Sequence, residues 1–244
     1  MKNANSNVDS NVTVIIPALN EEENIREVIQ ELGQMGYGDI LVVDGNSTDR
    51  TVEIARELAV NVVIQNEIGK GAALRQAFDH EGLNGSVIVV MDADGSMSPR
   101  EIPLFTEALD KGADLVKGSR FLMPGRSEDM NLIRRIGNGF FLLLVNLIWS
   151  ANYTDLCYGF AAFTRDAINR LSPYLKSTSF EIETEVFIKA RKLGLRVIEV
   201  PSVEFRRKRG KSNLSIFRDG FRILRTISRE FIDGRRIRNR TTSK

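Results

Sequence analysis

The first half of this 244-residue chain alternates between short apolar runs and amphipathic stretches, and this alternation constrains its fold more than any other feature. The run VTVII at 12–16 is continuous and β-branched, as expected of a buried strand. The next stretch places Ile25, Val28, Ile29 and Leu32 at helical spacing. The alternation continues through five strands to residue 119. It predicts an α/β fold in which helices cover both faces of a mostly parallel sheet.

Ligands of such sheets bind beyond the carboxyl ends of the strands. Asp44 ends the second predicted strand, and Asp92 and Asp94 follow the fourth. Pro17 and Glu21 stand at the end of the first strand. We therefore expect the three aspartates to line one crevice at this edge.

Asp92 and Asp94 are separated only by Ala93, and two carboxylates this close repel each other unless a cation compensates them. Mg²⁺ and Mn²⁺ take oxygen ligands, often one or two carboxylates plus substrate phosphates. One aspartate can then hold the metal while the other reaches elsewhere on the substrate. Taken alone, the segment DADG is equally compatible with an ordinary turn.

Lys70 is flanked by glycines at the start of a predicted helix, a position that suits phosphate binding. The spacing of a P-loop is absent, and no Gly-x-Gly-x-x-Gly follows the first strand. The sequence therefore indicates neither an ATPase nor a dinucleotide cofactor.

Charge is distributed unevenly. Residues 205–244 contain 14 Lys and Arg against 3 Asp and Glu, a net charge of +11, whereas the remaining residues carry −9. A basic tail on an acidic body indicates a polyanionic partner. Because the tail has little aromatic interleaving and no recognised reader motif, we expect a membrane surface rather than nucleic acid.

Two segments of the second half are expected at that surface. The helix predicted at 131–152 is strongly apolar, but we expect it to be too short and too interrupted to span a bilayer. Residues 214–244 are expected to form a basic amphipathic helix and tail at the membrane interface. Residues 11–213 are expected to form the globular domain, and the polar residues 1–10 a disordered lead-in rather than a secretory signal.

Five segments in series carry a resemblance: TVIIPALNEEENI, ILVVDGNSTDRT, GKGAALRQAF, VVMDADGSMSP and LVKGSRF. Together they resemble the family 2 glycosyltransferases, which have the Rossmann-like GT-A fold. The later segments YTDLCYGFAAFTRD, FEIETEVFIKARKLGLRVIEVP and FRRKRGKSNLS resemble the branch that transfers hexoses to polyprenyl or dolichyl phosphate.

The resemblance implies roles toward a nucleotide sugar. Pro17, Glu21 and Asp44 would hold the nucleoside, and Asp92 and Ala93 the ribose or pyrophosphate side. Asp94 would hold Mg²⁺ or Mn²⁺, with Asp92 as a further candidate ligand. Ser96 stands where relatives offer Gln, and its shorter side chain is a further candidate ligand of the metal.

Basic residues would bind the phosphates. Arg120 would contact a phosphate, Arg134 and Arg135 the phosphate of the acceptor, and Arg207 the diphosphate. Relatives often place Lys where this chain has Asn213, and Lys211 is the candidate substitute.

The implied reaction is inverting transfer of a hexose from a sugar nucleotide of the GDP-mannose or UDP-glucose type to a polyprenyl phosphate. It would take place on the cytoplasmic face of a membrane, with a homo-oligomer or a membrane-protein partner left open. One alternative is a hydroxyl acceptor, soluble or glycan, with Asp155 as the catalytic base. Another is a non-catalytic, membrane-associated scaffold.

Overall fold

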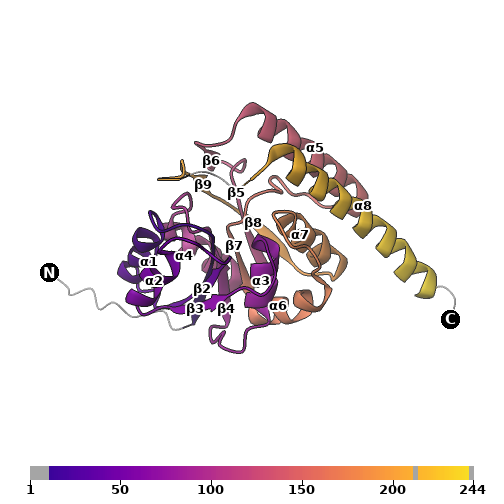
Figure 1. Cartoon of the computed structure of the whole chain (residues 1–244). Coiled ribbons are helices and arrows are strands. Elements are labelled where there is room, and N and C mark those ends of the chain that lie inside the picture. Colours follow the sequence, from indigo (N-terminus) through magenta and orange to yellow (C-terminus); the bar gives the residue numbers. More distant parts are fainter. Residues whose placement is uncertain (1–10, 211–213, 242–244) are drawn as a thin grey trace.

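The computed structural model describes residues 11–210 and 214–241, so the expected lead-in and Lys211 lie outside the described residues. Strands and helices alternate along the first half, as expected from the sequence (Figure 1). Two 3-10 turns, Pro99–Glu101 and Ser172–Tyr174, accompany the longer elements. The elements are β1 (Val12–Ala18), α1 (Ile25–Gln34), β2 (Asp39–Asp44), α2 (Thr51–Glu57), β3 (Asn61–Ile64), α3 (Lys70–Phe78), β4 (Val87–Val90), α4 (Ile102–Asp110), β5 (Leu115–Ser119), β6 (Arg126–Ser127), α5 (Leu132–Trp149), β7 (Ala161–Thr164), α6 (Arg165–Leu171), α7 (Ile182–Lys192), β8 (Val197–Pro201), β9 (Val203–Glu204) and α8 (Ile216–Thr241).

The central sheet has seven strands in the order β3-β2-β1-β4-β7-β5-β8. All neighbouring pairs are parallel except those of β7, which runs antiparallel to both β4 and β5. The mostly parallel sheet predicted from the sequence is therefore confirmed. The reversed strand β7 was not anticipated, because four residues, AAFT, show no periodicity of their own. A second small sheet pairs β6 with β9.

Helices cover both faces of the sheet because successive strand residues point to opposite sides. In β1, Ile16 joins a core that includes buried residues of α1, α2 and α4. Its neighbour Ile15 joins the other core, to which α3, α6 and α7 contribute. This two-sided packing leaves the carboxyl ends of the strands as the edge at which a site can open.

α5 and α8 lie side by side at the outside of the α7 layer (Figure 1). The apolar side chains of α5 recur every three or four residues on its exposed face, so they are not part of the core. That exposed row consists of Leu132, Ile136, Phe140, Leu143 and Leu147.

One expectation about α5 was wrong. By length and composition alone, this helix is long and apolar enough to cross a membrane, with 18 residues and a mean hydropathy of 1.4. It is the one such helix among the described residues, and 11% of it is buried. Arg134, Arg135 and Asn138 interrupt the apolar sequence, but the helix as a whole is still apolar enough to cross a membrane.

α8 is helical, as the sequence predicted, but its apolar side chains divide between the core and the surface. Ile223 and Ile227 are buried in the core, whereas Phe217 and Phe221 are exposed. The buried carboxylate of Glu230 anchors the helix to α7 through ion pairs with lysines. The role of this helix at a membrane stays a prediction.

Candidate active site

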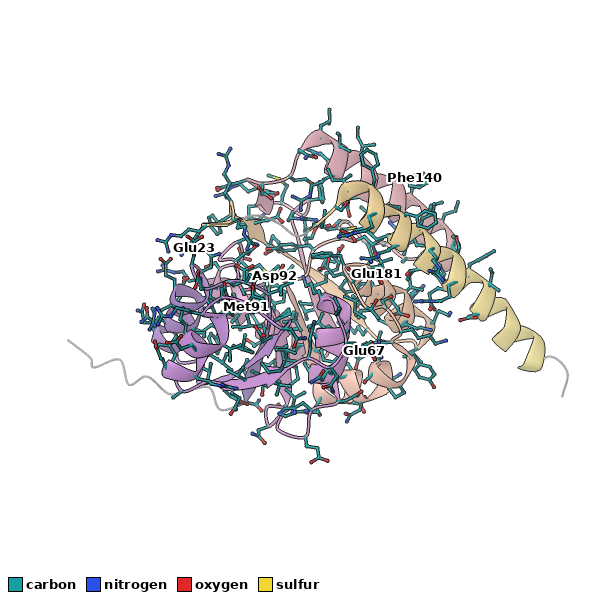
Figure 2. The ribbon with its side chains drawn as sticks, in the orientation of Figure 1. Glu23, Glu67, Met91, Asp92, Phe140 and Glu181 are labelled. Carbon is teal, nitrogen blue, oxygen red and sulfur yellow. The ribbon has the colours of Figure 1, made fainter. Side chains whose placement is uncertain are left out.

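A cavity of about 640 Å³ opens at the carboxyl ends of β1 and β4. Figure 2 shows Asp92, which lines it, near the middle of the molecule. The cavity continues to α5 and α8, where Ile133, Ile136, Phe141 and Ile223 line it. It thus joins a charged end at Asp92 and Asp94 to a second end, where the apolar side chains of α5 and α8 lie among the arginines Arg134, Arg218 and Arg222. The predicted site residues that line it are Pro17, Glu21, Lys70, Asp92, Ala93, Asp94, Ser96, Arg120, Arg134 and Arg207.

Asp92 is paired with Lys70 rather than left open for a metal. Lys70 Nζ lies 2.6 Å from Asp92 Oδ1 and 2.8 Å from Glu183 Oε1. Burial raises the pKa of Asp92 to about 6, and the charges of Asp94 and Glu183 add to this effect while Lys70 opposes it. Burial alone would lower the pKa of Lys70, but its two carboxylate neighbours outweigh burial and raise it.

Asp94 is paired with Arg207. The Nη1 of Arg207 lies 3.2 Å from Asp94 Oδ2, and its Nη2 lies 2.5 Å from Glu21 Oε1. The backbone N–H of Ser96 donates to Asp94 Oδ1. A guanidinium therefore bridges two carboxylates that come from the ends of different strands.

The basic segment 205–210 lies across this end of the cavity and is tied down on both sides. The backbone N–H of Phe205 donates to the carbonyl of Ser96, at 2.8 Å. Beyond Arg207, Lys208 and Arg209 both pair with Glu27 on α1. These contacts hold Arg207 over Asp94.

The residues present fit a hard divalent cation that is bound together with a phosphate group. The positive charge of Arg207 already rests between Asp94 and Glu21, where a cation is favoured. No group of three or more His, Cys, Asp or Glu within residues 11–210 and 214–241 could hold a metal ion alone. An ion at Asp94 would therefore need phosphate oxygens or water to complete its shell, as Mg²⁺ commonly does.

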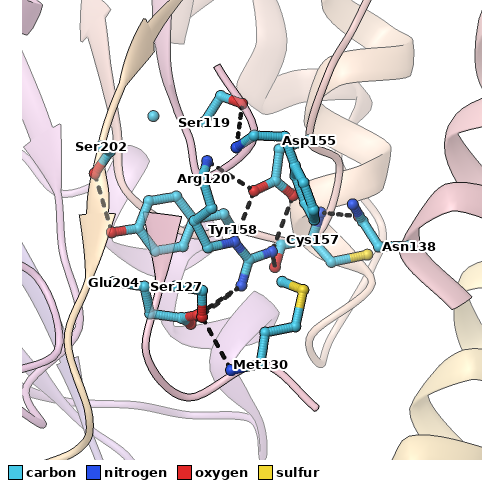
Figure 3. Close-up of polar contacts among 12 residues, drawn as sticks. Ser119, Arg120, Ser127, Met130, Asn138, Asp155, Cys157, Tyr158, Ser202 and Glu204 are labelled. Atoms are coloured by element: carbon cyan, nitrogen blue, oxygen red, sulfur yellow. Dashed lines mark hydrogen bonds and ion pairs between the residues drawn. The ribbon is translucent and has the colours of Figure 1, made fainter. Parts of the chain in front are cut away.

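Arg120 is locked in a buried cluster with Asp155 and Glu204 (Figure 3). Its Nε and Nη2 donate to the two oxygens of Asp155, Nη1 to both oxygens of Glu204, and Nη2 also to the carbonyl of Cys157. These contacts engage all three nitrogens of the guanidinium. A phosphate contact by Arg120 would have to compete with these partners.

Asp155 is fully buried, and both of its oxygens accept from Arg120. Burial alone would raise its pKa, but the charges of Lys117 and Arg120 outweigh burial and hold it below the usual range for a carboxyl. A general base must reach the proton that it removes. Asp155 is not among the residues that line the cavity, so this geometry is that of a structural acid.

Asp44 and Arg135 also do not line the cavity. Asp44 is 1% exposed, and Ser47 donates to both of its oxygens. Arg135 is stacked on Phe121, 5.5 Å from its ring centroid. Arg134 does line the cavity and pairs with Asp129. The roles implied for these residues stay predictions.

Four acids that line the cavity were not singled out from the sequence: Asp129, Glu183, Glu204 and Asp219. Glu183 and Glu204 pair with cations that the sequence did select, Lys70 and Arg120, but lie 113 and 84 positions away from them. The signal available was an acid within a segment that carried the resemblance, Glu183 in FEIETEV, to which no role was assigned.

Comparison with known proteins identifies the family. The family model "Glycosyl transferase family 2" matches residues 13–172. "Glycosyltransferase AglJ" of Haloferax volcanii is 33% identical over 212 residues, 86% of this chain and 68% of that protein. "Dolichol-phosphate mannosyltransferase" of Pyrococcus furiosus is 33% identical over 213 residues, 83% of this chain and 59% of that protein.

Among solved structures, glucosyl-3-phosphoglycerate synthase from Mycobacterium tuberculosis superposes with a TM-score of 0.71 and 20% identity. The match covers 92% of this chain and 81% of that chain, a structure that contains Mn²⁺, UDP and glucosyl-3-phosphoglycerate. The fold predicted from the resemblance, GT-A, is confirmed by this likeness. The chain belongs to glycosyl transferase family 2 and is a glycosyltransferase.

Proposed function

We propose that the chain transfers a hexose from a nucleotide sugar of the GDP-mannose or UDP-glucose type to a polyprenyl or dolichyl phosphate. The observation that carries the proposal is the shared cavity, whose charged end holds Asp92 and Asp94 and whose second end is formed by α5 and α8. A sugar nucleotide matches the first end and an isoprenoid chain the second. The relative named for mannose transfer to dolichol phosphate supports the same acceptor class.

At the charged end, Asp94 would hold Mg²⁺ or Mn²⁺ together with the nucleotide diphosphate, with Ser96 beside it. A bound divalent ion supplies charge neutralisation for the departing nucleoside diphosphate. Arg207 lies within reach of the same phosphates, since its guanidinium now rests on Asp94 and Glu21. Lys70 holds Asp92 against the donor end of the cavity.

In the transfer step, an oxygen of the acceptor phosphate attacks the anomeric carbon from the side opposite the nucleotide. The new C–O bond forms as the bond to the nucleotide β-phosphate breaks, so the configuration inverts and a nucleoside diphosphate leaves. A phosphate monoester is already ionised at neutral pH. The step therefore needs no strong base, which agrees with the engagement of Asp155 by Arg120.

We further propose that the enzyme works as a peripheral protein on the cytoplasmic membrane face. The exposed apolar row of α5, together with Phe217 and Phe221 on α8, supports a lipid-facing surface beside the cavity. Arg134, Arg218 and Arg222 line the cavity next to it and suit anionic headgroups. Because α5 packs against α7 and α8, we place it on the bilayer rather than across it.

The alternative acceptor, a hydroxyl group, would require a base at the sugar. Asp155, its candidate, is fully buried and accepts two hydrogen bonds from Arg120, so it is poorly placed for that role. A scaffold without activity would be expected to lose the donor groups. In this chain Glu21, Asp92 and Asp94 all stand in the cavity.

The deciding experiment incubates the purified chain with radiolabelled GDP-mannose, UDP-glucose or UDP-N-acetylglucosamine, with Mn²⁺ or Mg²⁺, and with polyprenyl phosphate. We expect label in the organic phase after solvent extraction, for one donor above the others. Polyprenol without phosphate is the matched control and should accept no label. Label on polyprenol, or none in either lipid, would contradict the proposal.

A further inference from the structure

We propose that Glu183 is a positioning residue for the donor site, acting through Lys70 on Asp92. Glu183 holds the ammonium group of Lys70 in place, and Lys70 in turn fixes the orientation of the Asp92 carboxylate. The inference rests on the proposed function in one respect only, namely that the donor occupies the end of the cavity at Asp92. It assigns a role to α7, an element that no donor motif includes.

The three charged groups form one chain of contacts inside the cavity wall. Lys70 Nζ lies 2.8 Å from Glu183 Oε1 and 2.6 Å from Asp92 Oδ1. The side chains of Lys70 and Glu183 are 10% and 11% exposed, whereas that of Asp92 is 29% exposed. Asp92 is therefore the member of the chain that a ligand can reach most easily.

The hydrogen-bonding inventory of Lys70 explains why it needs two partners. An ammonium group has three N–H donors, and Glu183 and Asp92 take two of them. One donor is left for a ligand. Because Lys70 binds Oδ1 of Asp92, Oδ2 is the oxygen left to face the donor. Without Glu183, the ammonium would be free to rotate and Asp92 would lose its fixed orientation.

Two glycines, Gly159 and Gly71, leave room for the contacts among Lys70, Glu183 and Asp92. A Cβ built on Gly159 would lie 2.6 Å from Lys70 Nζ and 2.7 Å from Glu183 Oε1. Gly71, next to Lys70, would likewise meet the backbone of residues 177–179 at under 3.0 Å. A side chain at position 71 would collide with the 177–179 backbone, whereas one at position 159 would displace the ends of the Lys70 and Glu183 side chains. Two segments from the second half of the sequence, 157–159 and 177–179, thus pack around Lys70 from the first half.

The net charge of the three groups indicates how the protein should respond to the loss of Glu183. One lysine between two carboxylates leaves a net charge of −1, so removing Glu183 alone would leave a neutral Lys70–Asp92 pair. Such a pair remains stable, which means that loss of Glu183 should affect orientation more than folding. Groups that orient metal ligands typically cost 10- to 100-fold when removed, and we expect about that loss here.

The test is a double-mutant cycle of Glu183→Gln and Lys70→Met. Alone, Glu183→Gln should lower kcat/KM for the donor about 10- to 100-fold with an unchanged melting temperature. In the Lys70→Met background, the same substitution should change kcat/KM by no more than about twofold, since its effect passes through Lys70. If the losses of kcat/KM in the two single variants multiply in the double variant, the two residues act independently and the proposal is overturned. Full activity of Glu183→Gln would overturn it as well.

Glu181→Gln is the matched control. Glu181 lies just before α7 and accepts hydrogen bonds from the backbone of Thr178 and Ser179, but it does not contact Lys70. Its effect, whatever its size, should be the same with and without Lys70→Met. Coupling of Glu181 equal to that of Glu183 would mean that the cycle reports general packing of α7, and the proposal would fail.

A second readout separates this proposal from the choice of acceptor. Calorimetric binding of GDP and of UDP, with Mn²⁺, needs no lipid, and the cycle should show the same coupling there. Binding coupling without lipid transfer would refute the proposed acceptor and keep the role of Glu183. If Glu183→Gln does not fold, Gly159→Ala keeps all three charges and disturbs only their approach. Gly159→Ala should then weaken nucleotide binding when Lys70 is present and should have no effect on binding in the Lys70→Met variant.

Discussion

Arg207 Nη1 lies 3.2 Å from Asp94 Oδ2, so the carboxylate expected to hold a metal carries a guanidinium in this structure. The same guanidinium pairs with Glu21, at 2.5 Å. Two carboxylates at this end of the cavity thus share one guanidinium, which comes from a residue 113 positions beyond Asp94. A divalent ion at Asp94 has to compete with this contact.

Replacing Arg207 should therefore have opposite effects on metal binding and on transfer. Hydrogen bonds to charged groups contribute about 1.5–3 kcal/mol, so we expect Arg207→Met to bind Mn²⁺ about tenfold more tightly in the absence of nucleotide. Transfer should fall, because the diphosphate loses a cationic contact. Electron paramagnetic resonance of free Mn²⁺ measures the first effect. Arg209→Met is the control, since Arg209 pairs with Glu27 and not with Asp94.

Asp94→Asn should remove metal-dependent binding while keeping the fold. Asn is isosteric and retains one oxygen for the backbone N–H of Ser96, so the local turn should survive. Charge neutralisation of roughly 4 kcal/mol corresponds to about three powers of ten in rate. We expect a loss of that size in kcat, with loss of Mn²⁺-enhanced nucleotide binding by calorimetry. Unchanged turnover would remove Asp94 from the mechanism.

The sequence predicted the fold and the edge of the sheet at which the cavity opens, because both depend on local periodicity and on one rule of parallel sheets. β1, β2 and β4 could be read from β-branched runs, and the rule placed Asp92 and Asp94 at their ends. The pairing of Lys70 with Glu183 could not be read in this way, because it depends on how α7 packs beside α3. Their separation of 113 residues leaves no local signal.

Arg120 shows a second kind of information that could not be predicted from the sequence, namely the partners of a selected side chain. The resemblance selected Arg120 as a phosphate contact, and the residue lines the cavity, but sequence alone does not reveal what its guanidinium binds. Asp155, 35 positions away, and Glu204, 84 positions away, meet it only after β5 and β9 are placed. A motif thus identified the residue, whereas its partners required the tertiary structure.

Asp155→Asn should chiefly destabilise the protein. Breaking a buried ion pair typically costs about 3–5 kcal/mol, and without the charge of Asp155 the two buried cations Lys117 and Arg120 would lose a carboxylate near both, with Glu204 still paired to Arg120. Urea unfolding at pH 7 measures this loss. A variant of unchanged stability that has lost all activity would instead favour a catalytic role and a hydroxyl acceptor.

The destabilisation caused by Asp155→Asn should depend on pH. Lys117 and Arg120 hold the pKa of Asp155 below its unfolded value of about 3.9, despite burial. The stability contributed by ionised Asp155 is therefore present above pH ~4 and is lost as the pH falls through the lower, folded pKa. Wild type and Asp155→Asn should differ by a constant free energy of unfolding above about pH 5, and the difference should shrink in stronger acid. A difference independent of pH down to pH 2 would contradict this account.

Membrane attachment should depend on the exposed row of α5. Leu143 and Leu147 are 64% and 76% exposed, so charged substitutions there should leave the fold intact. Each apolar side chain buried in lipid contributes about 1.5–3 kcal/mol, and Leu143→Glu with Leu147→Glu should therefore weaken vesicle binding at least tenfold. Co-sedimentation with phosphatidylglycerol vesicles measures the change. Leu104→Glu, at a 43% exposed position on α4, is the control and should bind as wild type, because α4 covers the opposite face of the sheet. Equal binding by all three proteins would exclude α5 as the lipid contact.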